Sequence, residues 1–345
     1  MKIVAPLNRL NEIEGLINAG ADELYSGLID RSQWQRFGGM GCINRRAEIF
    51  SNLNSVAQLK KAVDISHSHG VSFVLALNEY YNEAQCQLAI KQAELALDCG
   101  VDAILVADIG LMLMLRDRVK GLKFYLSSCA PVFNLEAINF YVGLGVSRIV
   151  LNRHLNIEEL KELSITANRK LEMEAFVLNE RCYNIDGFCS FEHGKCTNIF
   201  NFKMQQCIKG IMKKSMRFFP AVILSKINNC LVKNSHPCCF TFRQKLPKSE
   251  FEVSSNTVMF NTEKAFLYAC GLCAIYDLNL LGISYIKISG RSVLTDQIKN
   301  IRLVKKVLGL LEKVASKEEF IFQVKKIVRL NNRPCHPVYC YYSCK

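Results

Sequence analysis

Short apolar runs alternate along most of this chain with longer segments whose apolar residues recur at helical spacing. The apolar runs predict eight strands, at residues 2–5, 23–26, 71–77, 103–106, 122–126, 148–151, 171–177 and 284–288. The segments with helical spacing predict helices at residues 7–19, 55–69, 83–98, 109–115, 135–144, 157–168, 263–281 and 296–313. Strands that are each followed by a helix indicate a parallel sheet with right-handed crossovers. Eight such units favour a closed, TIM-like (β/α)8 barrel.

One phrase recurs at the joints between predicted helices and strands. AGADELYSG, CGVDAILVA, LGVSRIVLN and LGISYIKIS all place glycine at a helix end, then a short turn, then an apolar strand. Glycine is the residue that most readily closes a helix in the left-handed conformation. The repetition therefore supports one barrel built from similar units.

The alternation stops at residues 190–261, which are rich in Lys, Asn, Phe and Cys. A structureless loop of that length would be unusual in a compact domain, so we predict a cysteine-rich inserted subdomain before the last strand. The predicted organisation is seven barrel units in 1–189, the insertion in 190–261, the last unit in 262–315, and a C-terminal helix with a cysteine-rich tail in 316–345.

Composition narrows the class of protein. The chain has 345 residues, 16 of them cysteine, and a formal net charge of +13. It contains no apolar run long enough for a transmembrane helix, and its N-terminus lacks the pattern of a signal peptide. We therefore expect a cytoplasmic protein whose cysteines are reduced thiols, metal ligands or core residues. Plain packing is favoured for Cys86, Cys99 and Cys129.

The positive charge suits an RNA or an acidic small substrate. Lys299–Lys313 is locally basic, and a solvated helix face is the favoured interpretation of it. The final cysteines, Cys335, Cys340 and Cys344, could form a second metal site with His336, although a flexible tail is preferred for them.

The strongest chemical signal is a pair of cysteines after the seventh predicted strand. Cys182 and Cys189 are separated by six residues, and further thiols follow at Cys230, Cys238, Cys239 and Cys273. Four thiolates commonly bind structural zinc or an iron–sulfur cluster. The gap differs from the paired CxxC knuckles of zinc ribbons, and the one CxxC, Cys270–Cys273, falls in a predicted helix. A [4Fe–4S] cluster is therefore favoured over zinc, and a metal-free insertion stays open.

Polar residues at the strand ends of a barrel face one shared pocket. The candidates are Tyr25, Cys42, Asn78, Glu79, Asp108, Ser127, Ser128, Asn152, Arg153, His154, Asn179, Glu180, Cys182, Lys287 and Arg291.

Two sets among these candidates suggest specific chemistry. His154 with Asp108 or Glu180 could do acid–base work, but an inert polar role is favoured. Lys287 and Arg291 could clamp a carboxylate, and an ordinary salt bridge is an equal alternative.

Three motifs together resemble the U32 peptidase-like family: GADELYSG, EAFVLNERCYNIDGFC and GLCAIYDLNLLGISYIKISGR. These landmarks span residues 1 to about 310, and IKISGR is similar to the family's Lys-Ile-Glu-Gly-Arg signature. The resemblance implies a TIM-like barrel. Some members were labelled collagenase-like peptidases. Others are oxygen-independent hydroxylation proteins that act on transfer RNA, ribosomal RNA or the ubiquinone ring and carry a four-cysteine [4Fe–4S] cluster. In the RNA branch, prephenate is associated with the reaction as oxygen source.

The same resemblance assigns cluster ligands by position. Cys182 and Cys189 match the first two ligands, and Cys273 matches the ligand before the last strand. For the third we choose Cys239 over Cys238, with Cys230 in reserve. The family's His-Gly pair before the first cysteine is replaced here by Leu178-Asn179-Glu180-Arg181, which marks a divergent member.

We therefore expect an iron–sulfur enzyme, or enzyme subunit, that hydroxylates or otherwise modifies an RNA base or an aromatic small-molecule acceptor. The candidate catalytic residues are His154, Glu180 and Arg291, and Lys287 with Arg291 would hold prephenate. Two alternatives stay open. One is a U32-type peptidase or peptide-modifying enzyme, although the sequence has no HExxH or GxSxG motif. The other is a non-catalytic iron–sulfur subunit of a heteromeric complex.

Overall fold

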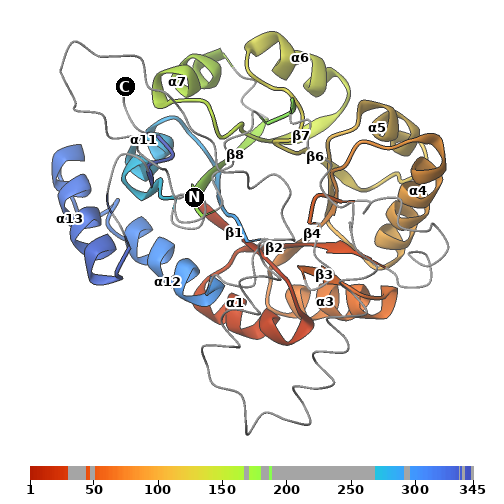
Figure 1. Ribbon diagram of the computed structural model, residues 1–345, viewed down its shortest axis with the longest axis horizontal. Helices are drawn as coiled ribbons and strands as arrows, with labels where there is room; N and C mark the ends of the chain where they lie inside the picture. Colours follow the sequence, from red (N-terminus) through yellow and green to blue (C-terminus); the bar gives the residue numbers. More distant parts are fainter. Residues whose placement is uncertain are drawn as a thin grey trace, which may run out of the picture.

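The computed structural model contains a closed barrel of eight parallel strands surrounded by helices (Figure 1). It describes residues 1–29, 44–46, 51–166, 171–179, 186–188, 269–290, 296–333, 335 and 339–342. The predicted fold class, a TIM-like (β/α)8 barrel, is confirmed. The predicted insertion at 190–261 lies outside the described residues.

The barrel strands are β1 (Lys2–Pro6), β2 (Glu23–Leu28), β4 (Ser72–Leu77), β5 (Ala103–Val106), β6 (Lys123–Leu126), β7 (Val146–Val150), β8 (Glu172–Leu178) and β9 (Tyr285–Ile288). They pair in the order β1-β9-β8-β7-β6-β5-β4-β2, and pairing of β1 with β2 closes the ring. A two-residue strand, β3 (Asn52–Leu53), which was not predicted, extends the sheet beside the end of β2.

The outer elements are η1 (Leu10–Glu12), α1 (Ile13–Ala19), α3 (Val56–Ser68), α4 (Glu83–Asp98), α5 (Ile109–Arg116), α6 (Leu135–Gly143), α7 (Ile157–Thr166), η3 (Leu272–Ala274), α11 (Ile275–Leu280), α12 (Gln297–Leu308) and α13 (Lys317–Leu330). Side chains of Ser55, Asn82, Asn134 and Ser316 accept hydrogen bonds from the free N–H groups of first turns. Such caps explain why several helices begin close to the predicted residues.

Two predicted helices are corrected. The helix predicted at 7–19 begins only at Leu10, as a 3-10 turn. The helix predicted at 263–281 is helical only from Leu272 among its described residues, because Cys270 forms β-bridges with Leu178 and Cys340. These pairings join segments far apart in sequence, so local periodicity could not reveal them. Cys270 therefore precedes the helical segment, whereas Cys273 lies in its first 3-10 turn.

Two apolar layers hold the barrel together. One lies between the strands and the helices, where Leu16, Leu59 and Val304 are fully buried or nearly so. The other fills the barrel interior with side chains such as Tyr25, Tyr125 and Phe176. Alternating residues of each strand thus serve opposite layers. In the described part of the chain, no helix combines the length and apolar character needed to cross a membrane.

Candidate functional site

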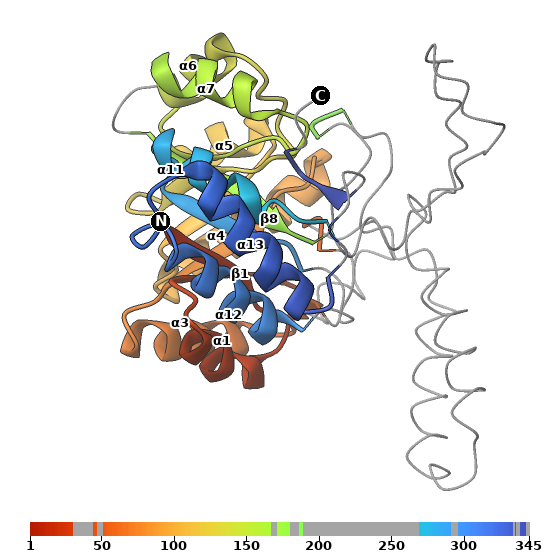
Figure 2. The ribbon, with the colours of Figure 1, turned by 90° about the vertical axis from the view of Figure 1, so that its left-hand side faces the viewer.

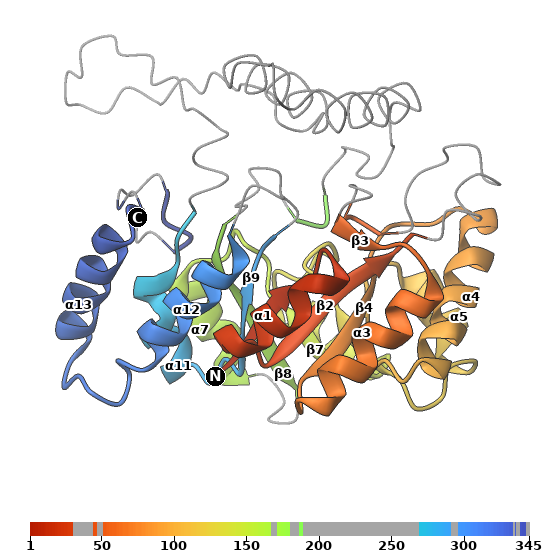
Figure 3. The same ribbon diagram turned by 90° about the horizontal axis from the view of Figure 1, so that it is seen from below.

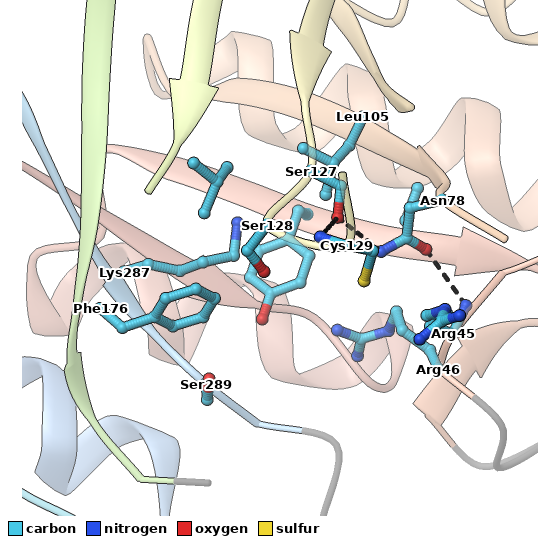
Figure 4. Close-up of a pocket in the computed structure, with 13 residues that line it drawn as sticks. Arg45, Arg46, Asn78, Leu105, Ser127, Ser128, Cys129, Phe176, Lys287 and Ser289 are labelled. Atoms are coloured by element: carbon cyan, nitrogen blue, oxygen red, sulfur yellow. Dashed lines mark hydrogen bonds between the residues drawn. The ribbon is translucent and has the colours of Figure 1, made fainter. Parts of the chain in front are cut away.

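A pocket of about 470 Å³, its open mouth included, lies at the carboxyl ends of the strands. Figure 4 shows Lys287 on one side and Arg45 with Arg46 on the other. Its lining residues are Tyr25, Arg45, Arg46, Ala76, Asn78, Leu105, Ser127, Ser128, Cys129, Val150, Phe176, Lys287 and Ser289. These described residues include three cations and no carboxylate, but Arg45 and Lys287 are paired with Glu79 and Glu174 outside the lining.

Neighbouring strand ends hold the two arginines. The Arg45 backbone N–H donates to Asn78 Oδ1 (3.1 Å), and its Nε donates to Glu79 Oε1 (3.2 Å). The Arg46 guanidinium donates to Asn8 Oδ1 (2.7 Å) and lies 5.0 Å from the centre of the Tyr25 ring. Arg46 is thus fixed to the barrel wall. Arg45 is anchored by its ion pair with Glu79, and these two side chains, which are 9% and 13% exposed, are partly shielded from water.

Glycine at position 27 allows this close approach. A Cβ atom there would lie 2.1 Å from Asn52 Oδ1 and 2.4 Å from Asn44 Nδ2. Such distances are well inside van der Waals contact, so a larger residue would displace Asn44 and, with it, the adjoining Arg45. We infer that Gly27 helps to position this side of the pocket.

Lys287 connects the pocket to a buried ionic group inside the barrel. Its Nζ lies 2.5 Å from Glu174 Oε1 and 4.1 Å from the centre of the Tyr25 ring. Glu174 also lies 3.4 Å from Arg148, which donates to Glu23 Oε1 at 2.6 Å. These four side chains are almost completely buried, so their charges must be neutralised mainly by one another.

Aromatic rings enclose the buried arginine. The Arg148 guanidinium carbon is 3.9 Å from the centre of the Tyr125 ring and 3.4 Å from that of Tyr285. Burial lowers the pKa of Arg148, but the charges of Glu174 and Glu23 outweigh burial and hold this pKa above its usual value. Burial raises the pKa of Glu23, and the attraction of Arg148 only partly opposes it. Arg148 is therefore the cation shared by the buried carboxylates Glu23 and Glu174, the second of which also pairs with Lys287.

A second buried ion pair supports the loop after β7. Arg153 Nη2 donates to Asp186 Oδ1 (2.6 Å), and its backbone N–H donates to Asp186 Oδ2 (3.1 Å). Burial raises the pKa of Asp186, but the charge and hydrogen bonds of Arg153 overcome it and lower that pKa. This pair is located outside the pocket lining and fixes a barrel loop.

Of the predicted acid–base residues, His154 and Asp108 lie in the described part of the chain. His154 is half-buried, and its charge acts on Asp186. Asp108 accepts hydrogen bonds from the Leu111 and Tyr81 backbone N–H groups at 2.8 and 3.1 Å, which cap α5 and fix the neighbouring loop. Glu180, the other predicted partner of His154, lies outside the described residues. The catalytic role of His154 stays a prediction.

The end of β8 is joined to the segment that carries Cys273. Gly271 N–H donates to Val177 O (2.7 Å), and Asn179 N–H donates to Ala269 O (2.9 Å). Asn179 has a φ of 62°, a left-handed conformation that asparagine tolerates better than most residues. Cys273 therefore lies beside the strand that leads into Cys182.

The C-terminal segment completes this region. Cys270 N–H donates to Tyr339 O (2.7 Å), and Tyr341 N–H donates to Cys270 O (3.0 Å). The Tyr341 ring is stacked 6.5 Å from that of Phe176, and Tyr342 donates to the Phe176 carbonyl (2.9 Å). Phe176 lines the pocket, so the thiol-bearing segments and the pocket share a wall.

Cys270 and Cys340 form a β-bridge at this wall. Burial is the largest cause that raises the pKa of Cys273 to about 12, with Cys270, Cys335 and Cys340 raising it further. Burial likewise raises the pKa of Cys270 to about 11. These thiols lie close enough to influence one another, yet in the described residues no group of three or more His, Cys, Asp or Glu side chains is arranged to hold a metal ion.

The predicted site residues are divided between described and undescribed parts of the chain. Tyr25, Asn78, Ser127, Ser128 and Lys287 line the pocket as the strand-end argument expected. The predicted residues outside the described ranges are Cys42, Glu180, Cys182, Cys189, Cys230, Cys238, Cys239, Arg291, His336 and Cys344.

Sequence reasoning missed five charged residues. Arg45 and Arg46 were hidden in a long predicted loop, where two consecutive arginines after a glycine-rich turn were the available signal. Glu23, Arg148 and Glu174 lie within apolar strands. A charged residue inside such a strand, on the face that the barrel buries, was the signal for an internal ionic group.

Comparison with known proteins identifies similar chains. A model described as peptidase family U32 matches residues 8–344. The tRNA hydroxylation protein P of Haemophilus influenzae is 24% identical over 216 residues, which cover 59% of this chain and 44% of that protein. The 23S rRNA 5-hydroxycytidine C2501 synthase of Escherichia coli is 22% identical over 41% of this chain and 21% of that protein.

A solved U32 peptidase structure matches 52% of this chain and 69% of its own, with a TM-score of 0.40 and 15% identity. The chain spans less than half the length of the curated relatives just described.

Proposed function

The chain belongs to peptidase family U32, and on that premise we propose that it is a [4Fe–4S]-dependent enzyme that hydroxylates an RNA base without molecular oxygen. Its relatives named for tRNA hydroxylation and for 23S rRNA 5-hydroxycytidine synthesis support an RNA acceptor. The observation that carries the proposal is the cation-lined pocket, which shares the Phe176 wall with the segment bearing Cys273.

The proposed cluster ligands are Cys182, Cys189, Cys239 and Cys273. The hydrogen bonds between the end of β8 and residues Ala269 to Gly271 support a common site for Cys182 and Cys273. Only two residues separate Asn179 from Cys182, which limits the distance between their Cα atoms to about 11 Å. An all-thiolate donor set suits an iron–sulfur cluster, which supplies one-electron redox chemistry when bound.

The pocket is proposed to hold the oxygen donor. Prephenate carries two carboxylates and a ring hydroxyl, and Arg45 and Lys287 offer cations on opposite sides of the pocket. A carboxylate held by charged hydrogen bonds would be oriented as well as bound. The overall exchange converts an acceptor C–H and a donor C–OH into an acceptor C–OH and a donor C–H. This exchange balances atoms and electrons without O2.

The acceptor base must leave its stack to reach such a pocket. Enzymes that modify bases within folded RNA generally act on single-stranded or extruded nucleotides. Tyr25, at the pocket wall, and Tyr80, which donates to the Cys129 carbonyl at 2.6 Å, are aromatic groups close to this entrance. Ser127 and Ser128 supply hydroxyl groups at the same strand end. The proposed role of these residues is to position the base beside the donor.

The test is an anaerobic reaction of the purified holoprotein with undermodified tRNA and prephenate. Mass spectrometry of the digested RNA should reveal a nucleoside heavier by one oxygen atom, formed only when both iron and prephenate are present. Peptide hydrolysis that survives removal of iron would instead support a U32-type peptidase. A cluster-containing protein that modifies neither RNA nor small aromatic acceptors would support the non-catalytic subunit.

Replacement of Arg45 tests the donor site directly. We expect Arg45→Gln to weaken prephenate binding by roughly tenfold to a hundredfold, because a charged hydrogen bond contributes about 1.5–3 kcal/mol. Isothermal titration calorimetry would measure this change. Arg118→Gln, at an exposed position after α5, is the matched control. Equal affinities in the two variants would contradict an anion site at Arg45.

A further inference from the structure

The outward side of α13 carries three cations between two exposed apolar side chains. Phe322, Lys325, Lys326, Arg329 and Leu330 are exposed and recur at the spacing of one helix face. The opposite face is apolar and packs on the barrel through Phe320, Val324, Ile327 and Val328. The exposed row is therefore not needed for packing. Its two acidic neighbours, Glu318 and Glu319, are confined to the first turn.

Helix α12 presents a similar face beside it. Arg302, Lys305 and Lys306 are exposed, and the buried side of the helix is apolar apart from Gln297 and Asn300. Figures 1 and 2 show α12 and α13 side by side on the outside of the barrel. We call Arg302, Lys305, Lys306, Lys325, Lys326 and Arg329 together the basic face.

Among the described residues, carboxylates do not neutralise the positive charge of the basic face. Elsewhere on these two helices, Lys299 lies 3.2 Å from Asp296 and Lys317 lies 2.7 Å from Asp277, whereas no ion pair joins a residue of the basic face to an acid among the described residues. Six neighbouring cations repel one another, which is unfavourable unless an anion is brought to them. The face therefore fits a polyanionic partner.

Two other outer helices have the opposite balance. Helices α4 and α7 each contain three acidic residues and one lysine, whereas α12 contains four basic residues and no acid. The basic face therefore differs in charge from α4 and α7, although α3 also carries two lysines against one acid.

The basic face leads toward the end of the barrel that carries the pocket. Arg333, three residues after α13, donates to Asn179 Oδ1 (2.7 Å) at the end of β8 and to Asn300 Oδ1 (3.0 Å) in α12. The C-terminal end of α13 is therefore fixed at the carboxyl edge of the sheet. Figure 3 shows α13 standing along the side of the barrel.

We infer that the basic face of α12 and α13 binds the phosphate backbone of the RNA acceptor while one of its bases enters the pocket, an inference that rests on the proposed function. Phosphate contacts position a nucleic acid without reading its sequence. A row of lysines and arginines along one helix provides such contacts.

The experiment measures binding of fluorescently labelled bulk tRNA to the full-length holoprotein by anisotropy, over a range of salt concentrations. The test variant is Lys325→Gln/Lys326→Gln/Arg329→Gln. The control variant, Lys60→Gln/Lys61→Gln/Lys91→Gln, removes the same charge from exposed positions on α3 and α4.

We expect the test variant to bind tRNA about tenfold or more weakly and to lower the slope of log affinity against log salt by about two to three. The control variant should retain the affinity of the parent protein to within about twofold, because its lysines lie on other helices. Iron content and thermal unfolding should match the parent protein in both variants.

Three results would overturn the inference in distinguishable ways. If the parent protein fails to bind tRNA even at low salt, both the RNA acceptor and the basic face are wrong. If the parent protein binds tRNA and the test variant binds equally well, only the basic face is wrong. If Phe322→Ala/Leu330→Ala loses tRNA binding while the test variant keeps the salt slope of the parent protein, this side of the barrel binds RNA through apolar contacts instead.

Discussion

Anaerobically purified Cys273→Ala and Cys182→Ala proteins are expected to lose their iron and acid-labile sulfide. The parent protein should contain about four iron and four sulfide ions per chain and should show the visible absorption of an iron–sulfur cluster. Removal of one thiolate from a four-cysteine site leaves an iron without its protein ligand, so cluster content should fall by most of its value. Iron and sulfide analysis with visible spectroscopy measures the result.

The matched control is Cys99→Ala. Cys99 is buried beside α4, where it packs in the apolar layer outside the barrel. Its replacement should cost some stability but leave iron content unchanged. Zinc in the parent protein, or no metal at all, would contradict the cluster and restore the peptidase and non-catalytic alternatives.

Alanine variants of the cysteines near Cys273 provide a second comparison. Cys270, Cys335 and Cys340 lie close enough to Cys273 to raise its pKa, although the resemblance did not assign them as ligands. The assignment therefore expects Cys270→Ala and Cys340→Ala to retain iron. If these variants lose iron and Cys182→Ala retains it, the cluster ligands must be reassigned to the C-terminal cysteines.

The barrel was predictable from sequence because its signals are local. Each apolar strand and each amphipathic helix repeats within a few residues, and glycine marks most returns. The segment before β9 was predicted wrongly for the opposite reason. Cys270 is held by Leu178 and Tyr341, which are about ninety and seventy residues away along the chain, and no local pattern encodes such pairings.

The site was predictable only in part. Strand-end position alone was enough to select Asn78, Ser127 and Lys287, because all strands of a parallel barrel end at one face. Arg45 approaches that face from a long loop, and its place depends on Asn78 and on the absence of a side chain at Gly27. Lys287 was expected either to bind an anion or to form a salt bridge. It lines the pocket and also pairs with Glu174.

The largest stability effect is expected from Arg148→Met. Arg148 is 1% exposed and pairs with Glu23 and Glu174, which are equally inaccessible. Methionine fills similar space but leaves these carboxylates without their shared cation. Removal of one partner from a buried ion pair costs roughly 3–5 kcal/mol, so the variant should unfold at much lower denaturant concentration. Urea unfolding followed by circular dichroism measures the difference.

This loss should depend on pH in a defined direction. In the parent protein burial already raises the pKa of Glu23 above its ordinary value of 4.5. The folded state then binds more protons than the unfolded state above pH 4.5, and the free energy of unfolding falls as pH rises through the pKa of the folded state. Without Arg148 that pKa rises further, because the opposing attraction is gone. Arg148→Met should therefore lose more stability at pH 8 than at pH 5.

Two variants separate this electrostatic effect from lost packing. Glu23→Gln/Arg148→Met removes one of the stranded carboxylates and should recover part of the stability, mostly at high pH. Arg118→Met changes an exposed arginine and should alter the unfolding free energy by less than about 0.5 kcal/mol. If Arg148→Met were equally destabilised at pH 5 and pH 8, the lost packing of Arg148 against the Tyr125 and Tyr285 rings would explain the effect. The buried charges would then contribute little to holding Lys287 at the pocket.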